Sequence, residues 1–172
     1  MKYVKYLLLI CLLFASCKSG NVSNITQVPD FDINQYLGTW YEIARLDIIF
    51  EKSMNNNFAT YTLNSDGSLN IVNTGYNFIQ HKWEKVTGKG KVGDESLKVS
   101  FFGPLYKDYV VISLDNSYLY AMVGTKNYEY LWILSRTTSI PESIKKQYVS
   151  MAKSLGYNTD DLIWTVHNAK LH

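Results

Sequence analysis

The sequence predicts an all-β fold, an eight-stranded antiparallel up-and-down β-barrel with one C-terminal α-helix packed on its wall. Three observations point to it: eight short runs of alternating apolar residues, turn signals between several of these runs, and helical spacing only near the C-terminus. The chain has 172 residues, of which 47% are hydrophobic and 15% aromatic. This composition fits one domain with a sizeable core, and the dispersed aromatic residues favour strands.

The eight candidate strands follow one another between residues 39 and 135. Turn signals such as Asn64-Ser65-Asp66-Gly67 and Gly103-Pro104 separate them. Eight strands at near-regular spacing indicate a sandwich or an up-and-down barrel, and an eight-stranded barrel is just wide enough for side chains or one small ligand. The expected strands are Thr39–Asp47, Phe58–Asn64, Ser68–Asn77, Lys82–Lys91, Ser96–Phe102, Tyr109–Leu114, Tyr118–Gly124 and Tyr130–Ser135.

The pattern changes to helical spacing after residue 140. We expect Ser139 to cap this helix, Pro141 to stand in its first turn and Gly156 to end it. A short strand, Leu162–Val166, follows. The helix must bury its apolar stripe, and the barrel wall is the available surface. The stripe consists of Ile144, Tyr148, Met151, Ala152 and Leu155.

The first 16 residues are expected to be a secretory signal peptide. Two lysines precede ten apolar residues, a run shorter than the roughly 20 that a permanent membrane helix requires. The small residues before Cys17 resemble a bacterial lipobox, which implies that Cys17 is acylated and anchors the chain to a membrane; an ordinary signal peptide with an incidental cysteine is the alternative. Residues 17–30 are expected to form the acylated N-terminus and a flexible tether. Lys18 is not the acidic residue that retains some lipoproteins in the inner membrane, which favours the outer membrane.

Charge and residue types exclude several functions. The net charge of +2 includes two lysines in the leader, and no clustered basic patch indicates nucleic-acid binding. The three histidines, His81, His167 and His172, form no catalytic or zinc-binding motif. The only cysteines are Cys11 and Cys17, so the exported domain offers no thiol. We therefore expect a protein that is not an enzyme, with no cofactor and no metal site.

Three runs carry a resemblance to a known family. Gly38–Arg45 reads GTWYEIAR, Leu97–Pro104 reads LKVSFFGP, and Tyr130–Arg136 reads YLWILSR. Together they resemble the motifs of the lipocalins, most of all the bacterial outer-membrane lipocalins and more distantly apolipoprotein D. The resemblance implies a lipocalin domain over residues 31–168 and a location at the outer membrane.

The resemblance also implies how the barrel closes. Trp40 would lie inside the closed end, with the Arg136 guanidinium across its ring, a contact worth about 0.5–2 kcal/mol. This pair would be structural and would not contact the ligand. Glu42 follows Trp40 by two residues and therefore shares its inward face. A carboxylate there needs a partner, unless the strand bends and Glu42 reaches solvent.

Alternation along the strands, combined with the resemblance, gives the expected ligand-binding residues. They form a mostly apolar lining with few polar groups, as small-molecule pockets do. Burying each methylene contributes about 0.8 kcal/mol, so a chain of about 14 to 18 carbons gains on the order of 10 kcal/mol before entropic costs. The expected lining residues are Tyr61, Ile71, Asn73, Val99, Phe101, Trp132 and Leu134.

The expected ligand is a fatty acid or lysophospholipid that the protein binds, stores or transports in the cell envelope. Two alternatives stay open: a carrier of another hydrophobic molecule, such as a tetrapyrrole, sterol or quinone, and an envelope scaffold whose barrel is filled by its own side chains. The resemblance also allows a homodimer.

Overall fold

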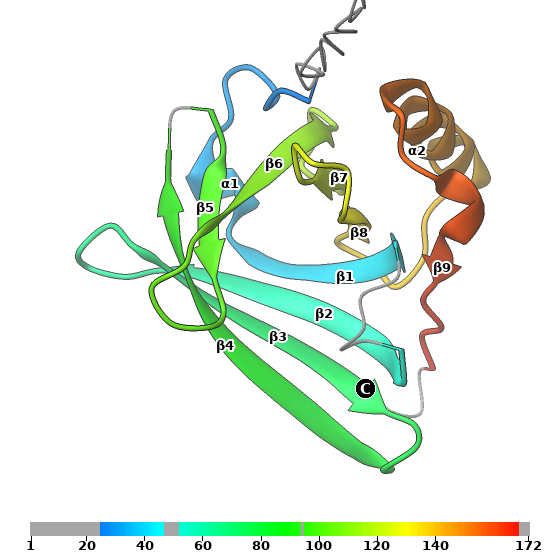
Figure 1. Cartoon of the computed structure of the whole chain (residues 1–172), viewed down its shortest axis with the longest axis horizontal. Coiled ribbons are helices and arrows are strands. Elements are labelled where there is room, and N and C mark those ends of the chain that lie inside the picture. Colours follow the sequence, from blue (N-terminus) through cyan, green and yellow to red (C-terminus); the bar gives the residue numbers. More distant parts are fainter. Residues whose placement is uncertain (1–24, 47–51, 94, 169–172) are drawn as a thin grey trace, which may run out of the picture.

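The structure is a computed structural model that describes residues 25–46, 52–93 and 95–168. The signal peptide and Cys17 lie outside these residues. Two α-helices and nine strands follow one another along the described chain, with one short 3₁₀-helix (Thr159–Asp161) between the last helix and the last strand (Figure 1). They are α1 (Ile33–Tyr36), β1 (Gly38–Arg45), β2 (Met54–Leu63), β3 (Leu69–Asn77), β4 (Lys82–Val92), β5 (Leu97–Ser100), β6 (Lys107–Leu114), β7 (Tyr120–Gly124), β8 (Leu131–Ser135), α2 (Glu142–Leu155) and β9 (Ile163–Trp164).

Strands β1 to β8 form a closed barrel. Each pairs antiparallel with the next from β2 to β8, and β1 pairs with both β8 and β2. Gly38 lies opposite Tyr61 across the β1–β2 seam, and Tyr41 lies opposite Ser135 across the β1–β8 seam. Closure rules out the sandwich and confirms the predicted barrel with one C-terminal helix.

Most strand boundaries lie within two residues of those expected, but β2 begins four residues early, at Met54. Its pairing with β3 shifts register between Asn55 and Phe58, and Asn56 has a left-handed φ of 51°. Such a bulge breaks the two-residue alternation on which strand prediction depends. The alternation of the sequence therefore did not predict where β2 begins.

Helix α1 was not predicted, because a single turn carries too little apolar periodicity to be recognised. The Asp32 side chain caps it by accepting a hydrogen bond from the Asn34 backbone amide. The helix lies at the end of the barrel where β1 begins, and Tyr36 is completely buried there. Trp40 Nε1 donates to the Tyr36 carbonyl at 2.8 Å. The first helix therefore forms the floor of the barrel.

Helix α2 ends where the sequence predicted but begins differently. Gly156 adopts the left-handed conformation, with φ of 103°, and its amide bonds the last turn of the helix. Pro141 takes the N-cap position, where no side chain caps the helix. The prediction that Ser139 caps it is wrong, because the N-cap lies two residues further along the chain, at Pro141. The Ser139 carbonyl accepts a hydrogen bond from Thr137 Oγ1 instead. In the described ranges, no helix is both long and apolar enough to cross a bilayer.

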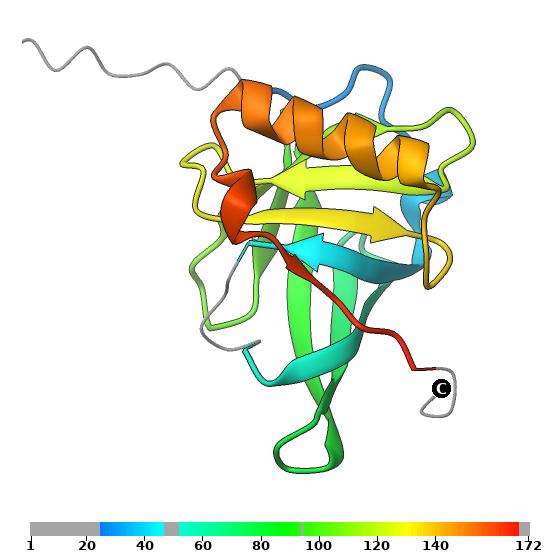
Figure 2. The same cartoon turned by 90° about the vertical axis from the view of Figure 1, so that its right-hand side faces the viewer.

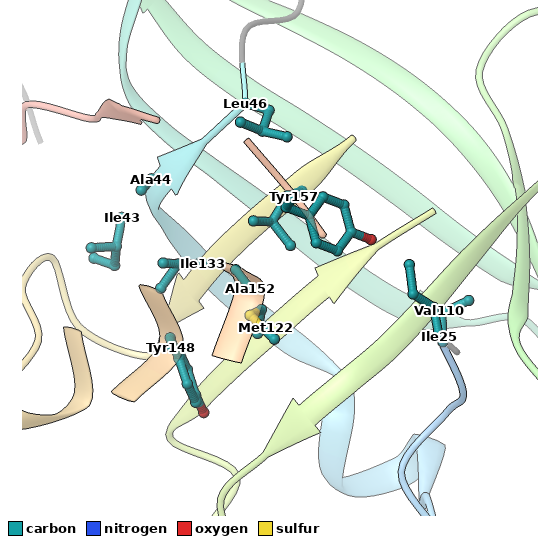
Figure 3. Packing of buried hydrophobic residues seen from close by; sticks show 11 residues of the cluster. Ile25, Ile43, Ala44, Leu46, Val110, Met122, Ile133, Tyr148, Ala152 and Tyr157 are labelled. Carbon is teal, nitrogen blue, oxygen red and sulfur yellow. The ribbon is translucent and has the colours of Figure 1, made fainter. Parts of the chain in front are cut away.

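The apolar stripe of α2 packs on the outer face of the barrel. Figure 2 shows the helix running alongside β7 and β8. Tyr148 and Ala152 of the helix are buried in one cluster with Met122 of β7 and Ile133 of β8 (Figure 3). The Tyr148 hydroxyl also donates to the Tyr120 carbonyl at 3.0 Å. This wall therefore buries apolar side chains on both faces.

Residues 25–30, which were expected to belong to the tether, lie against the barrel. Ile25 is 1% exposed and lies in the α2 cluster near Val110 (Figure 3). The Val28 amide donates to the Val111 carbonyl at 2.9 Å. Attachment to the barrel therefore begins at or before residue 25. The described part of the expected tether is ordered by these contacts.

The C-terminal segment fills the gap where β1 and β2 diverge. Strand β9 pairs with the end of β1, and the Thr165 amide donates to the Ile43 carbonyl at 3.0 Å. On the other side, the Asn56 amide donates to the Val166 carbonyl at 2.9 Å. The segment thus bridges two strands that no longer pair directly.

Candidate functional site

The interior of the barrel holds a cavity of about 490 Å³. Its size lies within the range of small-molecule pockets, about 300–1,000 Å³. Trp40 and Tyr61 line the end covered by α1, and Phe102 and Leu105, in the β5–β6 connection, line the opposite end. A hollow of this size is incompatible with a barrel filled by its own side chains.

The structure brings the seven residues expected to bind the ligand to this one cavity. They come from the four strands β2, β3, β5 and β8 and from the residue that follows β5. Tyr61, Ile71 and Leu134 are buried, whereas Val99 and Phe101 are partly exposed toward the mouth. Their contact with a ligand remains a prediction. The seven lining residues are Tyr61, Ile71, Asn73, Val99, Phe101, Trp132 and Leu134.

A glycine allows Phe101 to lie where it does. A Cβ built on Gly88 of β4 would come within 2.6 Å of the Phe101 ring. Strand β4 pairs with β5 only from Lys89 to Val92. The Phe101 ring therefore lies against the backbone of β4 beyond the point where the ladder between the two strands ends.

Sequence reasoning missed several lining residues. Tyr109 stands at the start of a predicted strand, and alternation with the buried Val111 would have placed it inside. Phe102 and Leu105 could not be found in this way, because they lie in a loop without alternation. Both are largely exposed, at 72% and 78%. They give the mouth an apolar rim.

The closed end combines a cation–π contact with hydrogen bonds. The Arg136 guanidinium carbon lies 3.9 Å from the centroid of the Trp40 ring. The same guanidinium donates to four backbone carbonyls around α1, β1 and the β6–β7 turn. Partial burial lowers the pKa of Arg136 from its ordinary value, and Tyr36 opposes this shift. These carbonyls belong to Gln35, Tyr36, Thr39 and Tyr118.

The Glu42 carboxylate is buried and bonds to three side chains. Its exposed fraction is 5%, so the alternative in which it reaches solvent does not occur. Oε1 accepts from Arg45 Nη1 at 2.7 Å, Asn57 Nδ2 at 3.2 Å and Thr165 Oγ1 at 2.5 Å. A buried ion pair requires such additional hydrogen bonds to offset desolvation. Glu42 therefore links β1, β2 and the C-terminal segment beside the cavity.

Three tyrosine hydroxyls meet at the floor of the cavity. Tyr109 Oη lies 2.8 Å from Tyr61 Oη and 3.3 Å from Tyr36 Oη. Burial raises the pKa of Tyr61 to about 12 and raises the pKa values of Tyr36 and Tyr109 well above their ordinary value. All three hydroxyls are consequently neutral near pH 7.

The mouth carries a cation beside aromatic rings. Lys107 lines the cavity, and its Nζ lies 5.1 Å from the centroid of the Tyr130 ring. Tyr130 in turn stacks on Trp132, with 5.9 Å between ring centroids. No set of three or more potential metal ligands gathers among the residues that the structure describes. The arrangement provides an apolar interior, a neutral polar floor and a charged rim.

Comparison with known proteins supports the resemblance. The Lipocalin-like domain model matches residues 31–167. The chain is 45% identical to the outer membrane lipoprotein Blc of Citrobacter freundii, over 88% of this chain and 89% of that one. It is 27% identical to apolipoprotein D of Rattus norvegicus, over 65% and 64%. These relatives confirm the predicted family and the expected location at the outer membrane.

The fold is also that of insecticyanin from Manduca sexta. That crystal structure aligns with a TM-score of 0.68 and 17% identity, covering 86% of each chain. At this identity the likeness concerns the fold alone. The closed barrel, its hollow apolar interior, the matched domain and the relatives lead to one conclusion: the chain belongs to the lipocalin family and has the hydrophobic-ligand cavity of a carrier protein.

Proposed function

We propose that this protein binds and transports single-chain lipids, fatty acids or lysophospholipids, at the outer membrane. The observation that carries the proposal is the cavity of about 490 Å³, which is mostly apolar and has the exposed Phe102 and Leu105 at its mouth. An acyl chain is flexible enough to follow such an interior. Each methylene that enters contributes about 0.8 kcal/mol.

The charges of the cavity suggest how the lipid lies. Lys107 is at the mouth, where it can pair with a carboxylate or phosphate while both groups stay in contact with water. The other charged groups among the described lining residues are the acids Glu42, Glu84 and Asp108. Since Arg45 is paired with Glu42, the described interior offers no unpaired cation to an anionic head group. The head group therefore stays at the mouth and the chain points to the floor.

The leader supplies the membrane anchor in this proposal. Residues 1–16 are removed as a signal peptide, and acyl chains on Cys17 hold the mature protein to the membrane. Several chains give stable anchoring where a single one is marginal. Seven residues separate Cys17 from the barrel contact at Ile25, a reach of at most about 30 Å. The lipocalin domain thus remains close to the lipid surface.

One chain encloses the whole cavity, so the proposal does not require a homodimer.

Displacement of a fluorescent fatty acid from the mature chain carrying Cys17→Ser tests the proposal. We expect binding of fatty acids and lysophospholipids, and a loss of at least about tenfold in affinity for Phe101→Arg and for Trp132→Glu, because each puts a charge into the apolar path. Thr87→Glu is the matched control, since this residue lies on β4 in an exposed position. Thermal melting shows that each variant is folded. Unchanged affinity in both cavity variants would contradict the proposal.

A planar ligand is the second candidate function. Trp132 lies between two tyrosine rings, with its centroid 5.9 Å from both Tyr109 and Tyr130, and such a row of rings suits a flat conjugated molecule. A coloured protein after purification, or displacement of the fluorescent fatty acid by a tetrapyrrole or quinone at lower concentration than by palmitic acid, would favour this candidate over the acyl lipid.

A further inference from the structure

The tyrosine cluster at the cavity floor holds more hydrogen-bond donors than it can use. Tyr36, Tyr61 and Tyr109 contribute three hydroxyl protons, but only two oxygen pairs lie within hydrogen-bonding distance, at 2.8 and 3.3 Å. Each pair uses one proton. No further hydrogen bond of these hydroxyls exists among the described residues. One proton is therefore left without an acceptor from the protein.

The position of the spare proton follows from the ways in which the two bonds can be oriented. If both outer hydroxyls donate to Tyr109, the spare proton is on Tyr109. If the donors run from Tyr36 through Tyr109, it is on Tyr61. Only the reverse order leaves it on Tyr36, which is completely buried and does not line the cavity. Since an unpaired buried donor is costly, the arrangements that direct the proton toward the cavity are favoured.

The surroundings of the cluster decide which acceptor can meet this proton. The nearest cation is Arg136, which already donates to four backbone carbonyls and lies across Trp40. A carboxylate or phosphate at the floor would be buried without a counter-charge, which is strongly unfavourable. A hydroxyl or carbonyl oxygen carries no such penalty.

We propose that the preferred ligand carries a neutral oxygen, a hydroxyl or carbonyl, at the buried end of its acyl chain, and that Tyr61 and Tyr109 bind it. The inference rests on the proposed function and refines it. The ligand class is a single-chain lipid with two polar ends: a charged head that Lys107 meets at the mouth and an uncharged oxygen at the floor. An unsubstituted chain would instead place a methyl group against the spare hydroxyl proton.

The test compares palmitic acid with its omega-hydroxylated analogue. Their dissociation constants are measured by displacement of the same fluorescent fatty acid from the mature chain carrying Cys17→Ser. One net hydrogen bond corresponds to about a twofold to tenfold difference in affinity. We expect the hydroxylated acid to bind more tightly by this factor, even though its terminal hydroxyl makes it the more soluble compound in water.

Two variants assign the preference to the cluster. The double variant Tyr61→Phe/Tyr109→Phe removes both hydroxyls that belong to the lining, and we expect it to lose the preference for the hydroxylated acid. Tyr36→Phe is the matched control: it removes a hydroxyl from the same cluster but leaves both lining hydroxyls in place, so the preference is expected to persist.

The outcomes separate this inference from the proposed function. If neither acid binds, the proposed function is wrong. If both bind equally to the parent chain, or if the preference survives in the double variant, the function stands and the inference is overturned. If the double variant instead binds palmitic acid much more weakly, the carboxylate reaches the floor, and the assignment of a neutral oxygen is wrong.

Discussion

The two walls of the barrel differ in what covers their outer face. Strands β1, β6, β7 and β8 lie next to α2, and every residue of β7 after Tyr120 is buried. Among the described residues, no helix lies over strands β2 to β5, and on β4 only Gly88 and Gly90 are buried. Figure 2 shows α2 beside β7 and β8. One wall therefore packs on two faces and the other on its inner face.

This difference separates stability from ligand binding. The covered wall buries apolar residues on both sides, where each large side chain contributes about 1.5–3 kcal/mol. The bare wall contributes Ile71, Val99 and Phe101 to the cavity, but its outer face is polar. We infer that the covered wall supplies most of the folding free energy, and that the bare wall tolerates change on its outside.

A charge on the outer face should distinguish the walls most strongly. Ala152→Glu places a carboxylate in the completely buried contact between α2 and the barrel. We expect a loss of at least about 4 kcal/mol in the free energy of unfolding, measured by urea denaturation. Thr87→Glu adds a carboxylate to the outer face of the bare wall and should change the free energy of unfolding by less than about 0.5 kcal/mol. Equal effects would remove the distinction between the walls.

The second prediction concerns the buried ion pair between Glu42 and Arg45, which lies on β1 of the covered wall. Arg45→Met leaves the Glu42 carboxylate buried with only neutral partners, Asn57 and Thr165. We expect a loss of about 3 kcal/mol, because breaking a buried pair on one side leaves an uncompensated charge. Restoring neutrality with Glu42→Gln in the Arg45→Met background should recover part of that loss in the same urea titration. If it recovers none, the charge is not the cause.

Closure at the floor should have a smaller effect. Arg136→Gln removes the cation from Trp40 and most of the bonds to four carbonyls, and we expect a loss of about 2 kcal/mol. Lys145→Gln is a geometric control, since its Nζ also lies 3.9 Å from an indole centroid, that of Trp164. That contact is at the surface and is worth at most about 0.5–1 kcal/mol. Melting temperatures show which variant is less stable. Similar values for the two variants would contradict the inference that the Arg136 contacts at the floor stabilise the barrel.

The smallest effect concerns the edge between the two walls, where β5 pairs with β6, and it depends on pH. Asp108 of β6 bonds to Lys98 of β5 and to Ser96, and these bonds hold the pKa of Asp108 below its ordinary value. Because the folded pKa is the lower one, the stabilisation is present above the unfolded pKa of about 3.9 and is lost as the pH falls through the folded pKa. Lys98→Met should cost about 0.5 kcal/mol at pH 7 and less at low pH. Urea titrations at both pH values measure this difference; a cost that grows at low pH would contradict it.

Much of the fold could be read from the sequence because strand alternation is a local property. Alternation placed Val99 and Phe101 inside the barrel, and both line the cavity, although Ser100 between them also reaches it. The same reasoning failed at Asn56, where the bulge interrupts alternation, and at α1, which is a single turn. It also failed at Ser139, because the helix begins at Glu142 and its N-cap is therefore Pro141.

The sequence alone therefore determined which residues face inward, where the last helix ends and which motifs the barrel carries, since each of these follows from neighbours within a few positions along the chain. Only the tertiary structure decided that the interior is hollow, that Thr165 completes the partners of Glu42, and that three tyrosines share two hydrogen bonds. These features depend on distances between residues up to 123 positions apart and on the volume left after all side chains are placed. No local pattern encodes either quantity.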